Sequence, residues 1–129
     1  MENESVHKKR VLVVDDDRGI LTFLSIKLRL CGYETIAANN GEKALELVRT
    51  ENPDIILLDI LMPGIDGYEV LQRMRVFSRL PVIVASAKGN EADKALRLGA
   101  NGFASKPFDM QRLLQKIGEL VDQPLAHTR

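Results

Sequence analysis

Five short aliphatic runs recur along the chain and constrain its fold more than any other feature. The first, third and fourth consist almost entirely of Val, Ile and Leu, which is typical of strands buried on both faces of a parallel sheet. Such a sheet needs helices on both sides to keep its faces away from water. The expected strands cover residues 11–14, 35–37, 55–58, 82–85 and 102–104.

Segments with helical periodicity lie between these runs, because their apolar residues recur at spacings of three and four. Gly32 is expected to end the first helix. Asp66, Asn90 and Asp109 are expected to cap the third, fourth and fifth helices, and Glu69 completes a capping box with Asp66. The faces predicted to meet the core comprise Ile20, Phe23, Leu24, Lys27, Leu28 and Cys31 in the first helix, Ala44, Leu45 and Val48 in the second, Val70, Leu71, Met74 and Phe77 in the third, and Met110, Leu113, Leu114, Ile117 and Val121 in the fifth.

The alternation of five strands with five helices predicts an α/β fold with a doubly wound, five-stranded parallel sheet. A length of 129 residues fits one domain with a single core. Residues 9–122 are expected to form this domain, 1–8 a flexible N-terminal lead-in, and 123–129 a C-terminal tail or the start of a linker.

The charge and the apolar content narrow the class of protein. Lys and Arg number 18 and Asp and Glu number 18, so the net charge does not indicate a nucleic-acid or anionic membrane partner. Cys31 is the only cysteine, which excludes a disulfide within the chain. No apolar run is long enough for a membrane span or of the signal-peptide type, so we expect a cytoplasmic protein.

Charged and hydroxyl side chains follow the predicted strands at their carboxyl ends, where open parallel sheets bind their ligands. Asp15 and Asp16 follow the first strand, Asp59 the third, Ser86 the fourth and Lys106 the fifth. Carboxylates brought close together repel, and a hard cation such as Mg²⁺ relieves the repulsion. A carboxylate can also attack phosphorus, and Mg²⁺, ammonium and hydroxyl groups stabilise a transferred phosphoryl group.

Four stretches together resemble the receiver domain of two-component response regulators. They are "VLVVDDD" (11–17), "PDIILLDILMPGIDGYEVL" (53–71), "PVIVASAKG" (81–89) and "LGANGFASKPF" (98–108). Any one of them is a weak signal, but their order and separation are highly specific. The resemblance implies a flavodoxin-like fold with strand order 2-1-3-4-5.

The resemblance also implies a role for each polar residue at this edge. Asp59 is expected to accept the phosphoryl group and to touch Mg²⁺. Asp16 is expected to bind Mg²⁺ directly, Asp15 through water, and Leu61 through its backbone carbonyl. Lys106 is expected to pair with a phosphate oxygen, as a point charge on a flexible stem. The bond from Lys106 to the proline that follows is expected to be cis, which is a feature of X-Pro bonds.

A phosphorylation switch follows from the same resemblance. The Ser86 hydroxyl is expected to move toward the phosphoryl group, and the Phe103 ring to follow it. The donor is expected to be a sensor histidine kinase or a histidine phosphotransfer protein, and the recipient of the signal a downstream effector or output domain. No direct contact of this domain with nucleic acid is expected, and a homodimer is an open option. The responding face, formed by the fourth helix, fifth strand and fifth helix, includes Lys88, Lys94, Arg97, Phe103 and Lys116.

Three positions depart from the common family pattern. Arg18 stands where many relatives have Pro, and Phe103 lacks the hydroxyl of the commoner Tyr. Leu61 is apolar and cannot orient an attacking water, so slow self-dephosphorylation is predicted. We therefore expect no enzyme activity beyond the chain's own phosphorylation and slow dephosphorylation.

Three other functions stay open on the residues alone. A haloacid-dehalogenase-like phosphatase needs a second carboxylate two residues after its Asp nucleophile, where this chain has Leu61. A flavin-binding flavodoxin-like protein needs a Ser, Thr or Gly-rich phosphate loop, where three consecutive aspartates would repel a phosphate. A degenerate receiver that binds partners without phosphorylation does not need the acidic, Ser and Lys set that this chain retains.

Overall fold

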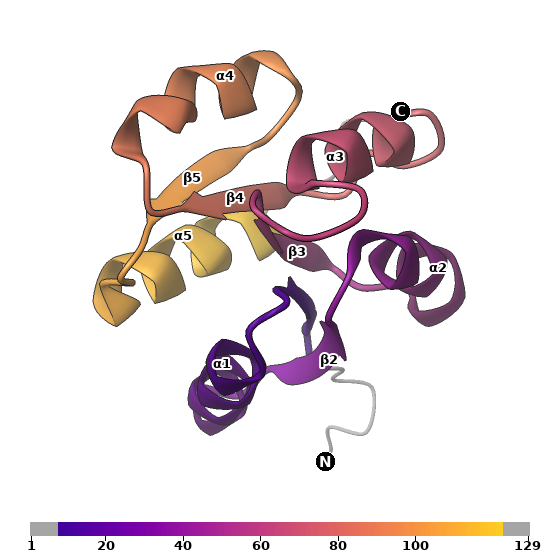
Figure 1. The fold of residues 1–129 in the computed structure, drawn as a ribbon. Helices are drawn as coiled ribbons and strands as arrows, with labels where there is room; N and C mark the ends of the chain where they lie inside the picture. Colours follow the sequence, from indigo (N-terminus) through magenta and orange to yellow (C-terminus); the bar gives the residue numbers. More distant parts are fainter. Residues whose placement is uncertain (1–7, 123–129) are drawn as a thin grey trace.

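The computed structural model describes residues 8–122 as five parallel strands alternating with five helices (Figure 1). The strands lie in the order β2-β1-β3-β4-β5, which confirms the predicted α/β fold and its topology. The predicted tail 123–129 and most of the lead-in 1–8 lie outside the described residues. The elements are β1 (Arg10–Val14), α1 (Arg18–Leu30), β2 (Glu34–Ala38), α2 (Gly41–Glu51), β3 (Ile55–Asp59), α3 (Gly67–Arg75), β4 (Val82–Ser86), the 3-10 turn η1 (Gly89–Glu91), α4 (Ala92–Arg97), β5 (Gly102–Ser105) and α5 (Met110–Val121).

Helices cover both faces of the sheet, with α1 and α5 on one face and α2, α3 and α4 on the other (Figure 1). Alternate residues of β3 therefore enter different cores. Ile55 and Leu57 pack on the side of α1 and α5, whereas Ile56 and Leu58 pack on the side of α2, α3 and α4. Each such side chain contributes about 1.5–3 kcal/mol when fully buried. The strand is thus fixed on both faces up to its last residue, Asp59.

Polar side chains cap four of the helices, and at α2 the cap is Asn40, which accepts a hydrogen bond from the Lys43 amide at 2.8 Å. Asp17 accepts a hydrogen bond from the Gly19 amide at 2.8 Å, and Asp66 and Asp109 accept from amides three residues further on, at 2.9 and 3.2 Å. Gly32 follows the end of α1 with a φ of 95°, a left-handed conformation that favours glycine. Three helix starts are thus held near the carboxyl ends of β1, β3 and β5, beside the predicted site.

The start of α4 differs from the prediction. Asn90 caps no helix, because it lies inside the 3-10 turn η1, and α4 begins only at Ala92. Neither the turn nor the helix has a side-chain cap. The capping box at α3 is incomplete as well, since the Glu69 carboxylate pairs with Arg73. The segment between β4 and β5 therefore lacks the side-chain caps that hold the starts of the other helices.

The predicted core faces of α1 and α3 include residues that lie outside the core. Phe23, Lys27 and Cys31 were expected to face the core but are exposed. Leu21, which was not expected there, is buried instead. A helix on a sheet buries one stripe, and a shift of two residues turns a side chain away from it. Phe77 remains 40% exposed, because it lies beyond the end of α3. Within residues 8–122, no helix combines the length and the apolar character that a bilayer span requires.

Candidate functional site

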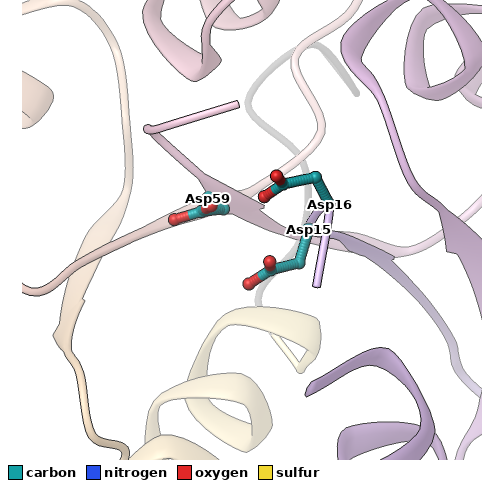
Figure 2. Close-up of side chains that lie close together, drawn as sticks. All are labelled: Asp15, Asp16 and Asp59. Carbon is teal, nitrogen blue, oxygen red and sulfur yellow. The ribbon is translucent and has the colours of Figure 1, made fainter. Parts of the chain in front are cut away.

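Three carboxylates converge at the carboxyl ends of β1 and β3, as the sequence predicts (Figure 2). Asp15 and Asp16 follow β1, and Asp59 is the last residue of β3. One oxygen from each lies within 4.8 Å of the others. Asp15 and Asp59 are buried, with exposed fractions of 3% and 5%, and Asp16 is open to solvent. The site is a half-enclosed cluster of negative charge with one accessible side.

Lys106 reaches this cluster from the carboxyl end of β5. Its Nζ lies 2.8 Å from Oδ2 of Asp15 and 3.1 Å from Oδ1 of Asp59, so one ammonium bridges the two buried carboxylates. Burial alone lowers the pKa of Lys106, but its bonds and charge interactions with Asp15 and Asp59 outweigh burial and raise the pKa. The ammonium therefore stays charged. The Lys106–Pro107 peptide bond is cis, as predicted.

The folded protein disfavours the ionised form of Asp59, whose pKa is raised. Burial is the main cause that raises the pKa of Asp59, and the neighbouring Asp15 raises it further. The bond and the charge of Lys106 act in the opposite direction but do not offset these two effects. A group of three carboxylates with one ammonium keeps an excess of negative charge, so further positive charge at this edge is favourable.

The donor set fits a hard divalent cation. All three side chains offer carboxylate oxygens, which Mg²⁺ prefers, and exposed Asp16 leaves room for the waters that Mg²⁺ retains. Asp15 Oδ1 also accepts a hydrogen bond from the Asp17 amide at 2.9 Å, which fixes that carboxylate. Leu61 lies two residues after Asp59 with its side chain 62% exposed. The contact of its carbonyl with a metal stays a prediction.

Ser86 and Phe103 lie on the neighbouring strands β4 and β5, but Ser86 ends its strand and pairs with Ser105, whereas Phe103 lies two residues before Ser105. Ser86 ends β4, is only 2% exposed, and accepts a hydrogen bond from the Lys88 amide at 3.0 Å. Phe103 pairs in register with Val84 and packs half-buried against the core on the side of α2, α3 and α4. Ser86 thus lies at the carboxyl edge of the sheet, as the sequence predicts, while Phe103 lies inside β5. Their movement on phosphorylation stays a prediction.

The face predicted to respond surrounds the edge strand β5. Helices α4 and α5 flank β5 on opposite faces of the sheet (Figure 1). Lys88, Lys94 and Arg97 are exposed on this part of the surface, and Lys116 is half-buried on α5. Lys94 is not free, since its Nζ lies 4.4 Å from the centre of the Tyr68 ring. This contact could not be predicted from the sequence, because Tyr68 belongs to α3 and Lys94 to α4.

Gly67 supports the site, although the sequence around it indicates only a helix that starts after Asp66. A Cβ at Gly67 would lie 2.3 Å from the carbonyl oxygen of Asp59 and 2.8 Å from the Cα of Ile60. Only glycine lets α3 start this close to the end of β3. The first turn of α3 therefore presses directly on the backbone of Asp59.

Gly67→Ala is expected to destabilise the protein by at least about 1–3 kcal/mol, because the added methyl group overlaps backbone atoms that cannot move aside cheaply. The matched control is Gly89→Ala, where nothing lies within 4 Å of the added Cβ, and a change within about 0.5 kcal/mol is expected. Urea unfolding measures both variants. Equal midpoints for Gly67→Ala and the wild type would show that α3 can move away from Asp59 freely.

Asp59→Asn is expected to stabilise the metal-free protein by about 0.5–2 kcal/mol at pH 7. The raised pKa of Asp59 means that its ionised form opposes folding, and Asn removes this charge while Lys106 keeps Asp15 at 2.8 Å. In the wild type the penalty is complete above the raised folded-state pKa and disappears as the pH falls below the ordinary value of 3.8. Urea midpoints in EDTA at pH 7 and pH 4 test this. A variant less stable at pH 7, or a difference that does not shrink in acid, contradicts the prediction.

Comparison with protein families matches residues 11–118 to the family described as the response regulator receiver domain. Among curated proteins, the chain is similar to the probable transcriptional regulator ycf27 of Cyanophora paradoxa. The two are 40% identical over 118 residues, which cover 90% of this chain and 49% of that protein. The protein of the same name from Pyropia yezoensis is 41% identical over 123 residues, which cover 94% of this chain and 49% of its own length. The chain thus spans about half the length of these relatives.

Solved structures with the same fold include the receiver domain of the Francisella response regulator 1452. It has a TM-score of 0.84 and 33% identity, and the alignment covers 88% of this chain and 97% of that one. The response regulator protein TrrA of Thermotoga maritima, solved in complex with Mg²⁺ and BeF, has a TM-score of 0.81 and 35% identity. That alignment covers 87% of this chain and 98% of TrrA.

Proposed function

Because this chain belongs to the response regulator receiver domain family, we propose that Asp59 accepts a phosphoryl group from the phosphohistidine of a sensor kinase or of a histidine phosphotransfer protein. One observation carries the proposal. The Asp59 carboxylate lies buried at a strand end, 3.1 Å from the Lys106 ammonium and within a three-carboxylate cluster. A group buried only for stability would not be placed beside two further acids.

The proposed step transfers a phosphoryl group without oxidation or reduction. An oxygen of the Asp59 carboxylate forms a bond to phosphorus while the bond from phosphorus to the donor imidazole nitrogen breaks, and the electron pair leaves with the imidazole. Asp15, Asp16, Asp59 and the Leu61 carbonyl would hold Mg²⁺, which neutralises charge on the phosphoryl oxygens when bound. Lys106 lies within reach of those oxygens and supplies a fixed positive charge.

Phosphorylation then changes the surface around β5. The added charge at Asp59 draws the Ser86 hydroxyl away from the Lys88 amide, and Phe103 turns with it. The responding face of α4, β5 and α5 controls a downstream effector or an output domain. The relatives named probable transcriptional regulators support an output domain that acts in transcription, with no nucleic-acid contact by this domain itself.

We place this domain in the cytoplasm, where sensor kinases present their phosphohistidines, and we propose no enzyme activity beyond its own phosphorylation and slow dephosphorylation. A homodimer through α4, β5 and α5 is compatible with the exposed charges on that face. Cross-linking before and after phosphorylation distinguishes a dimer from a monomer.

The test of the proposed function is intact mass after incubation with acetyl phosphate, with Mg²⁺ or with EDTA. One phosphoryl adduct that forms only with Mg²⁺, maps to a peptide spanning residues 54–67 and is removed by hydroxylamine would support it, since hydroxylamine cleaves acyl phosphates. If the protein is folded but forms no adduct, the proposal is wrong. The chain would then be a binding module, and its acidic cluster would have a structural role only.

Leu61→Gln is expected to shorten the lifetime of the phosphorylated protein about tenfold, a modest part of the about 10²–10⁴-fold that a positioned proton acceptor supplies. The exposed Leu61 side chain cannot hold a water against phosphorus, whereas an amide at the same position can. Leu61→Met is the matched control and should leave the lifetime within about twofold. Loss of phosphate is followed by intact mass after removal of the donor. A wild-type adduct that disappears as fast as that of Leu61→Gln would refute the prediction.

A further inference from the structure

Tyr68 connects the phosphoacceptor region to α4. It is the second residue of α3, directly after Gly67, which touches the backbone of Asp59. Its ring is buried, with an exposed fraction of 8%, and its hydroxyl donates a hydrogen bond to the Glu91 carboxylate. On the same ring, the Lys94 ammonium lies 4.4 Å from the centroid. One side chain of α3 therefore holds a residue of η1 and a residue of α4.

Helix α4 depends on such contacts more than the other helices do. It has six residues, of which only Ala95 is buried, and no side chain caps either it or the preceding turn. A six-residue helix is far below the length at which a helix is stable alone. Its position is therefore set by side chains from neighbouring elements.

The two ends of this segment are held differently. At the far end, Arg75 of α3 donates from Nε and Nη2 to the Gly99 carbonyl at 3.1 and 2.9 Å, and Nη2 also donates to Asn101 Oδ1 at 3.0 Å. Asn101 Oδ1 in turn accepts from the Val82 amide at 2.9 Å, which ties this end to β4. At the near end, α3 contributes only the contacts of Tyr68 with Glu91 and Lys94 among the hydrogen bonds and cation-π contacts of the described residues. The near end is thus the one that can be released.

A short chain of bonds joins Ser86 to this near end. The Lys88 amide donates to Ser86 Oγ at 3.0 Å, and the Lys88 carbonyl accepts from the Glu91 amide at 3.1 Å. Glu91 then accepts from Tyr68. A rotation of Ser86 toward Asp59 gives up the Lys88 amide, which removes one support of the turn that presents Glu91.

We propose that the contact of Tyr68 with Glu91 and Lys94 is a latch that holds α4 in its unphosphorylated arrangement and sets how easily Asp59 phosphorylation shifts it. This inference rests on the proposed function and names a regulator of the same site. The latch and the phosphoryl group favour different arrangements of α4. A weaker latch therefore strengthens the binding of a phosphoryl group at Asp59. The buried ring gives the latch a fixed position, and the charged acceptor makes its hydrogen bond stronger than a neutral one.

Tyr68→Phe tests the latch, because it removes the hydroxyl and keeps the buried ring. The probe is beryllofluoride with saturating Mg²⁺, a phosphoryl mimic whose equilibrium affinity is measured by titration calorimetry. We expect Tyr68→Phe to bind it about fivefold to tenfold more tightly than the wild type, within the range of ordinary coupling between sites. Glu91→Gln, which weakens the same bond from its other end, should shift the affinity in the same direction.

The matched control is Tyr33→Phe, since Tyr33 is the other tyrosine of the chain and lies near Gly118 of α5. Its affinity for beryllofluoride should equal that of the wild type. Amide hydrogen exchange in residues 89–98 should accelerate in Tyr68→Phe and not in Tyr33→Phe. That readout separates release of α4 from a general loss of stability.

The failures of the two proposals look different. A wild-type protein that binds no beryllofluoride and forms no adduct on Asp59 overturns the proposed function. A wild type that binds it, with equal or weaker binding by Tyr68→Phe, overturns the latch and leaves the proposed function standing.

Discussion

Asp59→Asn is expected to acquire no phosphoryl group from acetyl phosphate and Mg²⁺ under conditions in which the wild type is fully converted. The amide keeps the size and place of the side chain but loses the anionic oxygen that attacks phosphorus. Because the amide is isosteric and removes a charge that opposes folding, the variant should fold. Loss of the adduct therefore reports chemistry and not unfolding.

The matched control for this result is Asp17→Asn. Asp17 lies next to the acidic cluster but caps α1 through Gly19, and Asn caps a helix about as well as Asp. Its adduct should form at the wild-type rate, within about twofold. An adduct on Asp59→Asn would mean that another group accepts the phosphoryl, and peptide mapping would identify it. Asp16 and Asp15 are the candidates by distance, since one oxygen of each lies within 4.8 Å of an Asp59 oxygen.

The part of the fold that the sequence predicts is the part governed by burial. Along β3, Ile55 and Leu57 face one core while Ile56 and Leu58 face the other, so no polar residue is tolerated until the strand ends. The run of aliphatics therefore marks both the strand and its end. The acid after such a run lies at the sheet edge for geometric reasons, which is why the site at Asp59 was predictable.

The features that escaped prediction depend on contacts between distant residues. Tyr68 and Glu91 are 23 positions apart, and their bond is visible only in the folded structure, where the Tyr68 side chain of α3 reaches η1. Gly67 gives a local turn signal, but its close approach to Asp59 depends on how α3 packs. The residue type of Asn90 favours a helix cap, but Asn90 lies inside the 3-10 turn η1, whose last residue Glu91 contacts Tyr68 of α3.

Stability and function conflict at the acidic cluster. The arrangement that lets Asp59 receive a phosphoryl group also buries Asp15 and Asp59 side by side, and only Lys106 among the described residues bridges them. Replacing Asp59 by its neutral amide should therefore help folding and abolish the chemistry. Glu91 is different, because its charge is paired with the Tyr68 hydroxyl and serves the position of α4.

Lys106→Met is expected to slow phosphorylation of Asp59 by acetyl phosphate by about 10²–10³-fold, the loss found when one fixed group that stabilises transition-state charge is removed. The ammonium lies 3.1 Å from Asp59, so it neutralises charge on the phosphoryl oxygens as they approach that carboxylate. Met keeps the length of the apolar stem and removes only the charge. Initial rates of adduct formation at saturating Mg²⁺ measure the effect.

A second effect of Lys106→Met must be separated from the first. Without the ammonium, the buried Asp15 and Asp59 lose their shared partner, and the metal-free protein is destabilised by up to about 3–5 kcal/mol, the cost of a buried charge left unpaired. Lys106→Arg keeps the charge and should fold. Its wider, planar head cannot occupy the place of a compact ammonium, so it should restore stability and only part of the rate.

Lys43→Met completes this comparison, because Lys43 is an exposed lysine on α2 with only a 3.8 Å pair to Glu46. Its rate should stay within about twofold of the wild type. A folded Lys106→Met that is phosphorylated at the wild-type rate would show that the ammonium only holds the two carboxylates together. A slow Lys106→Met beside a stable but still slowed Lys106→Arg would show that the position of the charge, and not its presence alone, drives the transfer to Asp59.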